Sequence, residues 1–144
     1  MKLRLLGLFA VGLLLAAEDS KKADEAVKLI EGTWEGVSLE QDGNKNDDVN
    51  NLTVRIHAGK YEVKMGDQTT GKGELKPDPT KKPQALDIIV EEGANNGQTQ
   101  LGIYEVKDDM LTICFAQPDK PRPSEFSAKE GSGNTLVVLK RRKK

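Results

Sequence analysis

After residue 32 the chain alternates apolar and polar positions in short runs, and turn-forming residues separate these runs. The segments 52–57 and 60–65 each place an apolar residue at every second position, with the Ala58-Gly59 step between them. A period of two is typical of a strand that buries one face. Two such strands around a short step that contains glycine predict a β-hairpin.

The same pattern continues to the end of the chain and predicts about eight short strands. The first strand begins near residue 32, and the others cover 51–58, 60–67, 70–76, 84–93, 99–107, 109–116 and 135–141. A second hairpin turn is predicted at Lys107-Asp108-Asp109, and Gly71 and Gly73 predict a bend or bulge within their strand. Eight antiparallel strands can close into a barrel, and closure removes the exposed edges of the sheet.

The segment between residues 18 and 32 has apolar residues at partly helical spacing and ends on a glycine, which predicts one to three helical turns. The sequence therefore predicts an all-β fold. We expect an antiparallel up-and-down barrel of about eight strands with a short N-terminal capping helix.

The only tryptophan, Trp34, stands at the start of the first predicted strand, directly after this helix. In a closed up-and-down barrel the first strand pairs with the last, so Trp34 comes to lie beside residues 140–142. We predict that Trp34 plugs the helix end of the barrel and that Arg141 or Arg142 lies across its indole ring. A cation–π contact of this kind contributes about 0.5–2 kcal/mol.

The barrel interior is predicted from the alternation of the strands. The residues predicted to face inward are Leu52, Val54, Ile56, Tyr61, Val63, Met65, Ile88, Leu101, Ile103, Leu111, Ile113 and Phe115. The candidate ligand-binding residues among them are Val54, Ile56, Tyr61, Val63, Met65, Ile103, Ile113 and Phe115. An eight-stranded barrel is either filled by its own side chains or holds one small ligand. The pattern fits both interpretations.

The first 17 residues differ from the rest of the chain. They begin with two basic residues, continue with an unbroken apolar run and end on two alanines. This order is typical of a secretory signal peptide, and the apolar run is shorter than the roughly 20 residues of a membrane-spanning helix. We predict a signal peptide over 1–17, with a retained membrane anchor as the alternative. Residues 18–144 then form a secreted or periplasmic barrel domain, not stably inserted in a membrane, with a basic tail from about residue 140.

Charge and cysteine content narrow the range of partners. Without the two basic residues of the first segment, 20 basic and 23 acidic residues remain, a net charge of −3, which predicts no nucleic-acid surface. The basic run Lys140–Lys144 is interpreted as a solubilising end of the last strand.

Cys114 is the only cysteine, so no intrachain disulfide can form, and its strand-like surroundings predict a buried thiol. We expect a monomer.

Motifs for catalysis or metal binding are weak in this chain. The loop that begins at Asp42 alternates acids and amides, but the sixth and twelfth positions lack the glycine and the acid of a calcium-binding loop. His57, the only histidine, is predicted on an outward strand face, and no nucleophile elbow accompanies it. We predict no catalytic residue, no metal ligand and no cofactor, and a protein that is not an enzyme.

The segment 117–126, QPDKPRPSEF, contains three prolines that restrict its conformation. Arg122 lies between two of them. The structural interpretation is a rigid crossover in which Arg122 bonds to backbone carbonyls or to an acid. The alternative is an arm that presents Arg122 to an anionic ligand or partner at the barrel mouth.

A Gly-x-Trp step after a short helix, followed by strands and a closing basic residue, resembles the lipocalin-like superfamily. A closer resemblance rests on LIEGTWEGVSLEQDG, KPDPTKKPQALDI, GIYEVKDDMLTICFA with PDKPRPSEF, and LVVLKR. These segments are similar to an uncharacterised secreted domain family abundant in planctomycete bacteria, and the resemblance covers residues 29–141. It implies a lipocalin-like barrel and an exported location, and it carries no catalytic residues to this chain.

These observations give one leading hypothesis and one alternative. The leading hypothesis is an exported, non-enzymatic barrel that binds a small, largely apolar ligand. The alternative is a filled β-barrel that acts as a protein-interaction or envelope-structural module, with an envelope protein as its partner.

Overall fold

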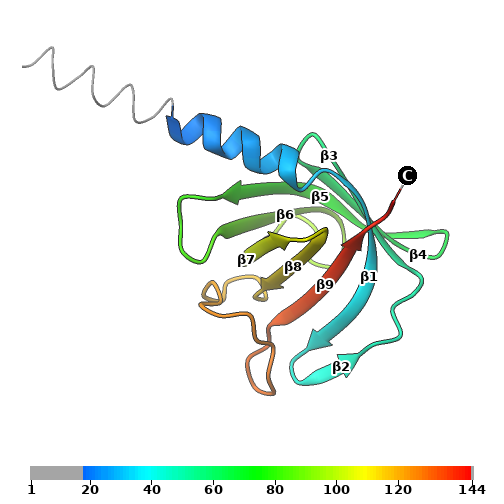
Figure 1. The fold of residues 1–144 in the computed structure, drawn as a ribbon. Coiled ribbons are helices and arrows are strands. Elements are labelled where there is room, and N and C mark those ends of the chain that lie inside the picture. The colour runs from blue at the N-terminus through cyan, green and yellow to red at the C-terminus, as the bar shows by residue number, and fades with distance from the viewer. Residues whose placement is uncertain (1–17, 144) are drawn as a thin grey trace, which may run out of the picture.

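The computed structural model describes residues 18–143, so the predicted signal segment 1–17 lies outside the described residues. Residues 18–29 are helical, and the rest of the described chain is built mainly from strands (Figure 1). The strands are β1 (Gly32–Gln41), β2 (Asn44–Asn46), β3 (Leu52–His57), β4 (Lys60–Met65), β5 (Gln68–Asp78), β6 (Ala85–Gly93), β7 (Thr99–Lys107), β8 (Met110–Phe115) and β9 (Thr135–Arg141). Among residues 18–143, no helix is long and apolar enough to cross a membrane.

Eight of the described strands form a closed antiparallel barrel. Their order is β1-β3-β4-β5-β6-β7-β8-β9, and β9 pairs with β1 to close the sheet. Each neighbouring pair is antiparallel, so the chain runs up and down around the barrel, and the predicted fold class is confirmed. The short β2 pairs only with the end of β1, across a turn at Asp42-Gly43 where both residues have positive φ angles. The sequence pattern missed this small hairpin.

Both predicted hairpin turns are present. Ala58 and Gly59 have φ angles of 51° and 80°, and they join β3 to β4. Asp108 and Asp109 have φ angles of 50° and 64°, and they join β7 to β8. Positive φ at both central residues matches the right-handed twist of the flanking strands. These turns fix the register of both strand pairs.

The bulge predicted at Gly71 and Gly73 is also present, in β5. The register shifts between Lys72 and Gly73 where β5 pairs with β6. Gly73 lies opposite Tyr61 of β4, and a Cβ atom at Gly73 would come within 2.8 Å of the tyrosine ring. Glycine at this position therefore lets the Tyr61 ring lie flat against the β5 backbone.

The helix end of the barrel is sealed by Trp34, as the sequence predicted. Its side chain is fully buried, and its Nε1 donates a hydrogen bond to the carbonyl oxygen of Ile30 (2.9 Å). Trp34 pairs with Arg141 across β1 and β9, and the guanidinium carbon of Arg141 lies 4.3 Å from the centroid of the indole ring. Figure 1 shows the helix, in blue, at this end of the barrel.

Arg141 also ties the helix to the barrel. Its guanidinium donates hydrogen bonds to the carbonyl oxygens of Glu31 and Leu29, the latter at 2.9 Å. Helix ends leave carbonyl groups without partners within the helix, and a cation is stabilising there. The first residues of the C-terminal basic run are tied to the barrel: Lys140 and Arg141 are part of β9, and Arg142 pairs with Glu35 at 2.7 Å.

The half of the barrel next to the helix is filled by side chains. Its largest fully buried residues include Trp34, Tyr104, Leu86 and Leu111. The hydroxyl group of Tyr104 has no hydrogen-bond partner within the described chain. Burial, with a smaller effect of the Asp78 carboxylate, raises the pKa of Tyr104 above its ordinary value, so the phenol stays neutral at physiological pH. This half is a packed core.

The loop 116–134 covers part of the outer surface of the barrel. Arg122 donates hydrogen bonds to the carbonyl oxygens of Leu86 (3.3 Å) and Gly102 (2.8 Å), and it pairs with Asp87 at 2.7 Å. This geometry matches the structural interpretation of Arg122. Cys114 is fully buried on the same outer side and donates a hydrogen bond to the Ser127 carbonyl, so the predicted buried thiol is confirmed.

Candidate functional site

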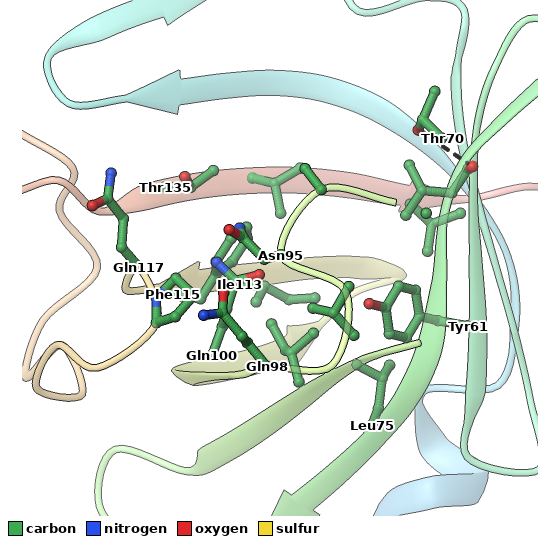
Figure 2. A pocket seen from close by; sticks show the side chains of 18 of the residues that line it. Tyr61, Thr70, Leu75, Asn95, Gln98, Gln100, Ile113, Phe115, Gln117 and Thr135 are labelled. Atoms are coloured by element: carbon green, nitrogen blue, oxygen red, sulfur yellow. Dashed lines mark hydrogen bonds between the residues drawn. The ribbon is translucent and has the colours of Figure 1, made fainter. Parts of the chain in front are cut away.

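The half of the barrel opposite the helix encloses a cavity of about 710 Å³. Its mouth is formed by the end of β1, the loop between β6 and β7, and the residues that follow β8. Ligand cavities in proteins commonly measure about 300–1,000 Å³ and are lined mostly by apolar side chains. Figure 2 shows the cavity with its lining side chains. The barrel is therefore filled at one end and hollow at the other.

The cavity walls are apolar. We call these residues the apolar wall: Val54, Ile56, Val63, Leu75, Ile88, Val90, Ile113, Phe115, Val137 and Leu139. They come from β3, β4, β5, β6, β8 and β9, so nearly the whole circumference of the barrel contributes. The alternation of each strand places these residues inward and their neighbours outward.

The mouth of the cavity is rich in side-chain amides. We call these residues the amide rim: Gln41, Asn95, Gln98, Gln100 and Gln117. The Nε2 atom of Gln100 donates a hydrogen bond to the carbonyl oxygen of Ala116 (3.2 Å). The side chains of the other four make no hydrogen bond to the described part of the protein, so they are available to a bound molecule.

Tyr61 is the polar group deepest in the wall. Its side chain comes from β4, and its hydroxyl oxygen points into the cavity (Figure 2). Burial and the nearby Glu91 carboxylate raise the pKa of Tyr61 above its ordinary value. The hydroxyl therefore remains protonated at neutral pH and can donate a hydrogen bond to a molecule in the cavity.

Most of the residues predicted as ligand contacts lie on this cavity. Val54, Ile56, Tyr61, Val63, Ile113 and Phe115 all line it. Met65 does not: it lies at the last position of β4, is 39% exposed, and contacts solvent in place of the cavity. Leu52 and Leu111, also predicted inward, are buried in the core without lining the cavity.

Ile103 is the second correction, and its predicted inward orientation is wrong. It pairs with Cys114 and Ala85, on the outer face of the sheet, where it is buried beside Pro123 of loop 116–134. The neighbouring residue Tyr104 points inward in its place. Leu101, predicted on the same face as Ile103, is likewise absent from the cavity lining. This outer face is apolar because loop 116–134 covers it.

The amide rim was not predicted from the sequence. Gln98 and Gln100 are polar residues near a loop, and by composition alone they look like solvent-facing positions. One signal was present. Gln100 lies on the same face of its strand as Gly102 and Tyr104, and the Asp108-Asp109 turn places that face inward. The other rim residues lie at strand ends or in loops, where alternation gives no direction.

The charges of the cavity lining are of one sign. Its ionisable acids are Glu92 and Asp119, both at the mouth, and no lysine, arginine or histidine lines it among the described residues. His57 lies elsewhere, with an almost fully exposed side chain 3.6 Å from Glu31.

Comparison of the chain with models of protein families, with curated proteins and with solved structures found no match.

Proposed function

We propose that this protein is an exported, non-enzymatic, lipocalin-like carrier that binds a small, largely apolar ligand in the open half of its barrel. The observation that supports this proposal is the 710 Å³ cavity with its apolar wall. A wall of aliphatic side chains favours apolar molecules, because each CH₂ group removed from water contributes about 0.8 kcal/mol. The amide rim and Tyr61 then offer hydrogen bonds to the polar end of the ligand.

Export is part of the proposal and rests on the sequence. The basic, apolar and small-residue order of residues 1–17 is that of a signal peptide. The resemblance to the planctomycete-type secreted family, which covers residues 29–141, supports the same location. The carrier role rests on the cavity alone. The filled-barrel alternative, an interaction or envelope-structural module, needs no hollow interior, and the cavity argues against it.

The test is uptake of an uncharged apolar probe, N-phenyl-1-naphthylamine, by the protein without its signal segment. Val63→Trp places a large side chain into the cavity, because Val63 belongs to the apolar wall. We expect wild-type protein to bind the probe with enhanced fluorescence, and we expect Val63→Trp to lose at least about tenfold in affinity, or about 1.4 kcal/mol.

Met65→Trp is the matched control. It adds the same side chain two positions further along β4, at an exposed site outside the cavity, and we expect it to bind like the wild type. Urea unfolding of both variants checks that they fold. Equal binding by Val63→Trp and the wild type, or no probe binding by the folded wild type, would argue for the filled-module alternative.

A further inference from the structure

The mouth of the cavity has a chemical character that goes beyond its apolar wall. The amide rim surrounds the entrance, and its neutral amides both donate and accept hydrogen bonds. Figure 2 shows rim residues reaching toward the cavity from the loop after β6, from β7 and from the segment after β8. A polar group held at this entrance would meet amides on several sides.

The cavity lining lacks the basic side chains that recognise an anion. Carboxylates and phosphates are commonly held in proteins by arginine or lysine. None of the described residues that line this cavity is basic, and its two charged residues at the mouth, Glu92 and Asp119, are acids. An anion that entered would lose hydration without gaining a partner of opposite charge.

The mouth is also a weak site for a cation. Glu92 and Asp119 are both exposed, so water screens their attraction for a positive group. Exposed ion pairs contribute little to binding for the same reason. The amides, in contrast, suit hydroxyl and amide groups, which donate and accept hydrogen bonds as the rim does.

From these observations we propose that the ligand is a single-chain amphiphile whose head group is uncharged and bears hydroxyl or amide groups, as in a monoacylglycerol. This inference rests on the proposed function and names its ligand class. The acyl chain lies against the apolar wall, and the head group lies at the amide rim. The cavity discriminates against the free fatty acid of the same chain length.

The experiment compares three probes that share one chain and differ in the head group: monolauroylglycerol, laurate and dodecyltrimethylammonium. Each displaces N-phenyl-1-naphthylamine from the wild-type protein below its micelle concentration, at about pH 8, where a carboxyl group is ionised. The salt concentration is about 0.15 M, which limits long-range electrostatic effects to roughly 8 Å. We expect monolauroylglycerol to bind at least about tenfold more tightly than laurate, and more tightly than the cation.

A matched pair of variants places the selectivity at the rim. Gln98→Lys introduces a cation at the mouth, and we expect it to reduce the preference for monolauroylglycerol over laurate by about tenfold. Thr99→Lys adds the same charge one residue further, at an exposed position outside the cavity lining, and we expect it to keep the wild-type preference.

The outcomes separate the two proposals. If laurate or the ammonium probe binds wild-type protein as tightly as monolauroylglycerol or more tightly, the head-group inference is overturned while the carrier proposal stands. If none of the three amphiphiles displaces N-phenyl-1-naphthylamine, the head-group inference fails. The carrier proposal still stands, because it rests on the binding of the dye itself. If the dye itself does not bind, both proposals fail.

Discussion

Replacement of Trp34 by alanine is expected to lower the free energy of unfolding by about 3–5 kcal/mol. Trp34 is fully buried at the helix end of the barrel, so its removal leaves a large cavity in the packed half. The variant also loses the hydrogen bond from Nε1 to Ile30 and the contact of Arg141 with the indole ring. Small domains have stabilities of about 5–15 kcal/mol, so this loss removes a large part of the total.

Urea unfolding followed by circular dichroism measures this effect, and Leu29→Ala serves as its control. Leu29 is the last residue of the neighbouring helix and is 54% exposed, so we expect its removal to change the free energy by at most about 0.5 kcal/mol. A loss of about 1 kcal/mol or less for Trp34→Ala would show that the indole does not seal the barrel.

The second large effect is expected at Gly73, where alanine should lower the free energy of unfolding by about 3 kcal/mol, the upper end of overpacking effects. A Cβ atom there would overlap the carbonyl oxygen of Ile89, which belongs to the backbone of β6 and cannot move alone. It would also press on the Tyr61 ring. Relief requires a shift of the β5–β6 pair at its bulge, next to the cavity.

Gly71→Ala is the matched control on the same strand. The nearest atom to a Cβ at Gly71 is the Glu92 carbonyl oxygen at 3.7 Å, an ordinary contact, and its φ angle is not in the left-handed region. We expect little loss of stability for this variant. Equal effects of the two substitutions in thermal or urea unfolding would contradict a specific role for the close approach at Gly73.

The architecture could be predicted from the sequence because local signals agreed. Period-two alternation, glycine and aspartate turns, and one tryptophan at the junction of helix and strand all indicate the same closed barrel. Closure predicts that Trp34 lies beside residues 140–142, and the register of β1 with β9 then selects Arg141. The short β2 escaped prediction because its three residues are all exposed and show no apolar pattern.

The orientation of β7 illustrates why the site was harder to predict than the fold. Its residues are apolar on both faces, since Ile103 lies under loop 116–134 while Tyr104 lies in the barrel core. The Asp108-Asp109 turn resolves this ambiguity. A two-residue turn pairs Val106 with Leu111, and cross-strand partners share a face, so the inward orientation of Leu111 requires Tyr104 to point inward.

The barrel is divided into a filled half next to the helix and a hollow half at the mouth. The helix half holds the largest buried side chains and the contacts of Arg141, and it supports the fold without the cavity. The mouth half keeps an open interior, although most residues of its apolar wall belong to the same buried core.

The most direct test of the account uses the six isoleucines of the chain, which sample every layer of the barrel. The measurement is a titration of the δ1-methyl-labelled protein with N-phenyl-1-naphthylamine, followed by nuclear magnetic resonance. Ile56, Ile88 and Ile113 line the cavity, and we predict ring-current shifts at these three methyl groups. Ile30 in the filled end and Ile103 on the outer face are predicted to remain unchanged. Shifts at Ile103 without shifts at Ile88 and Ile113, or no shifts at all, would contradict a ligand-binding cavity in the mouth half of the barrel.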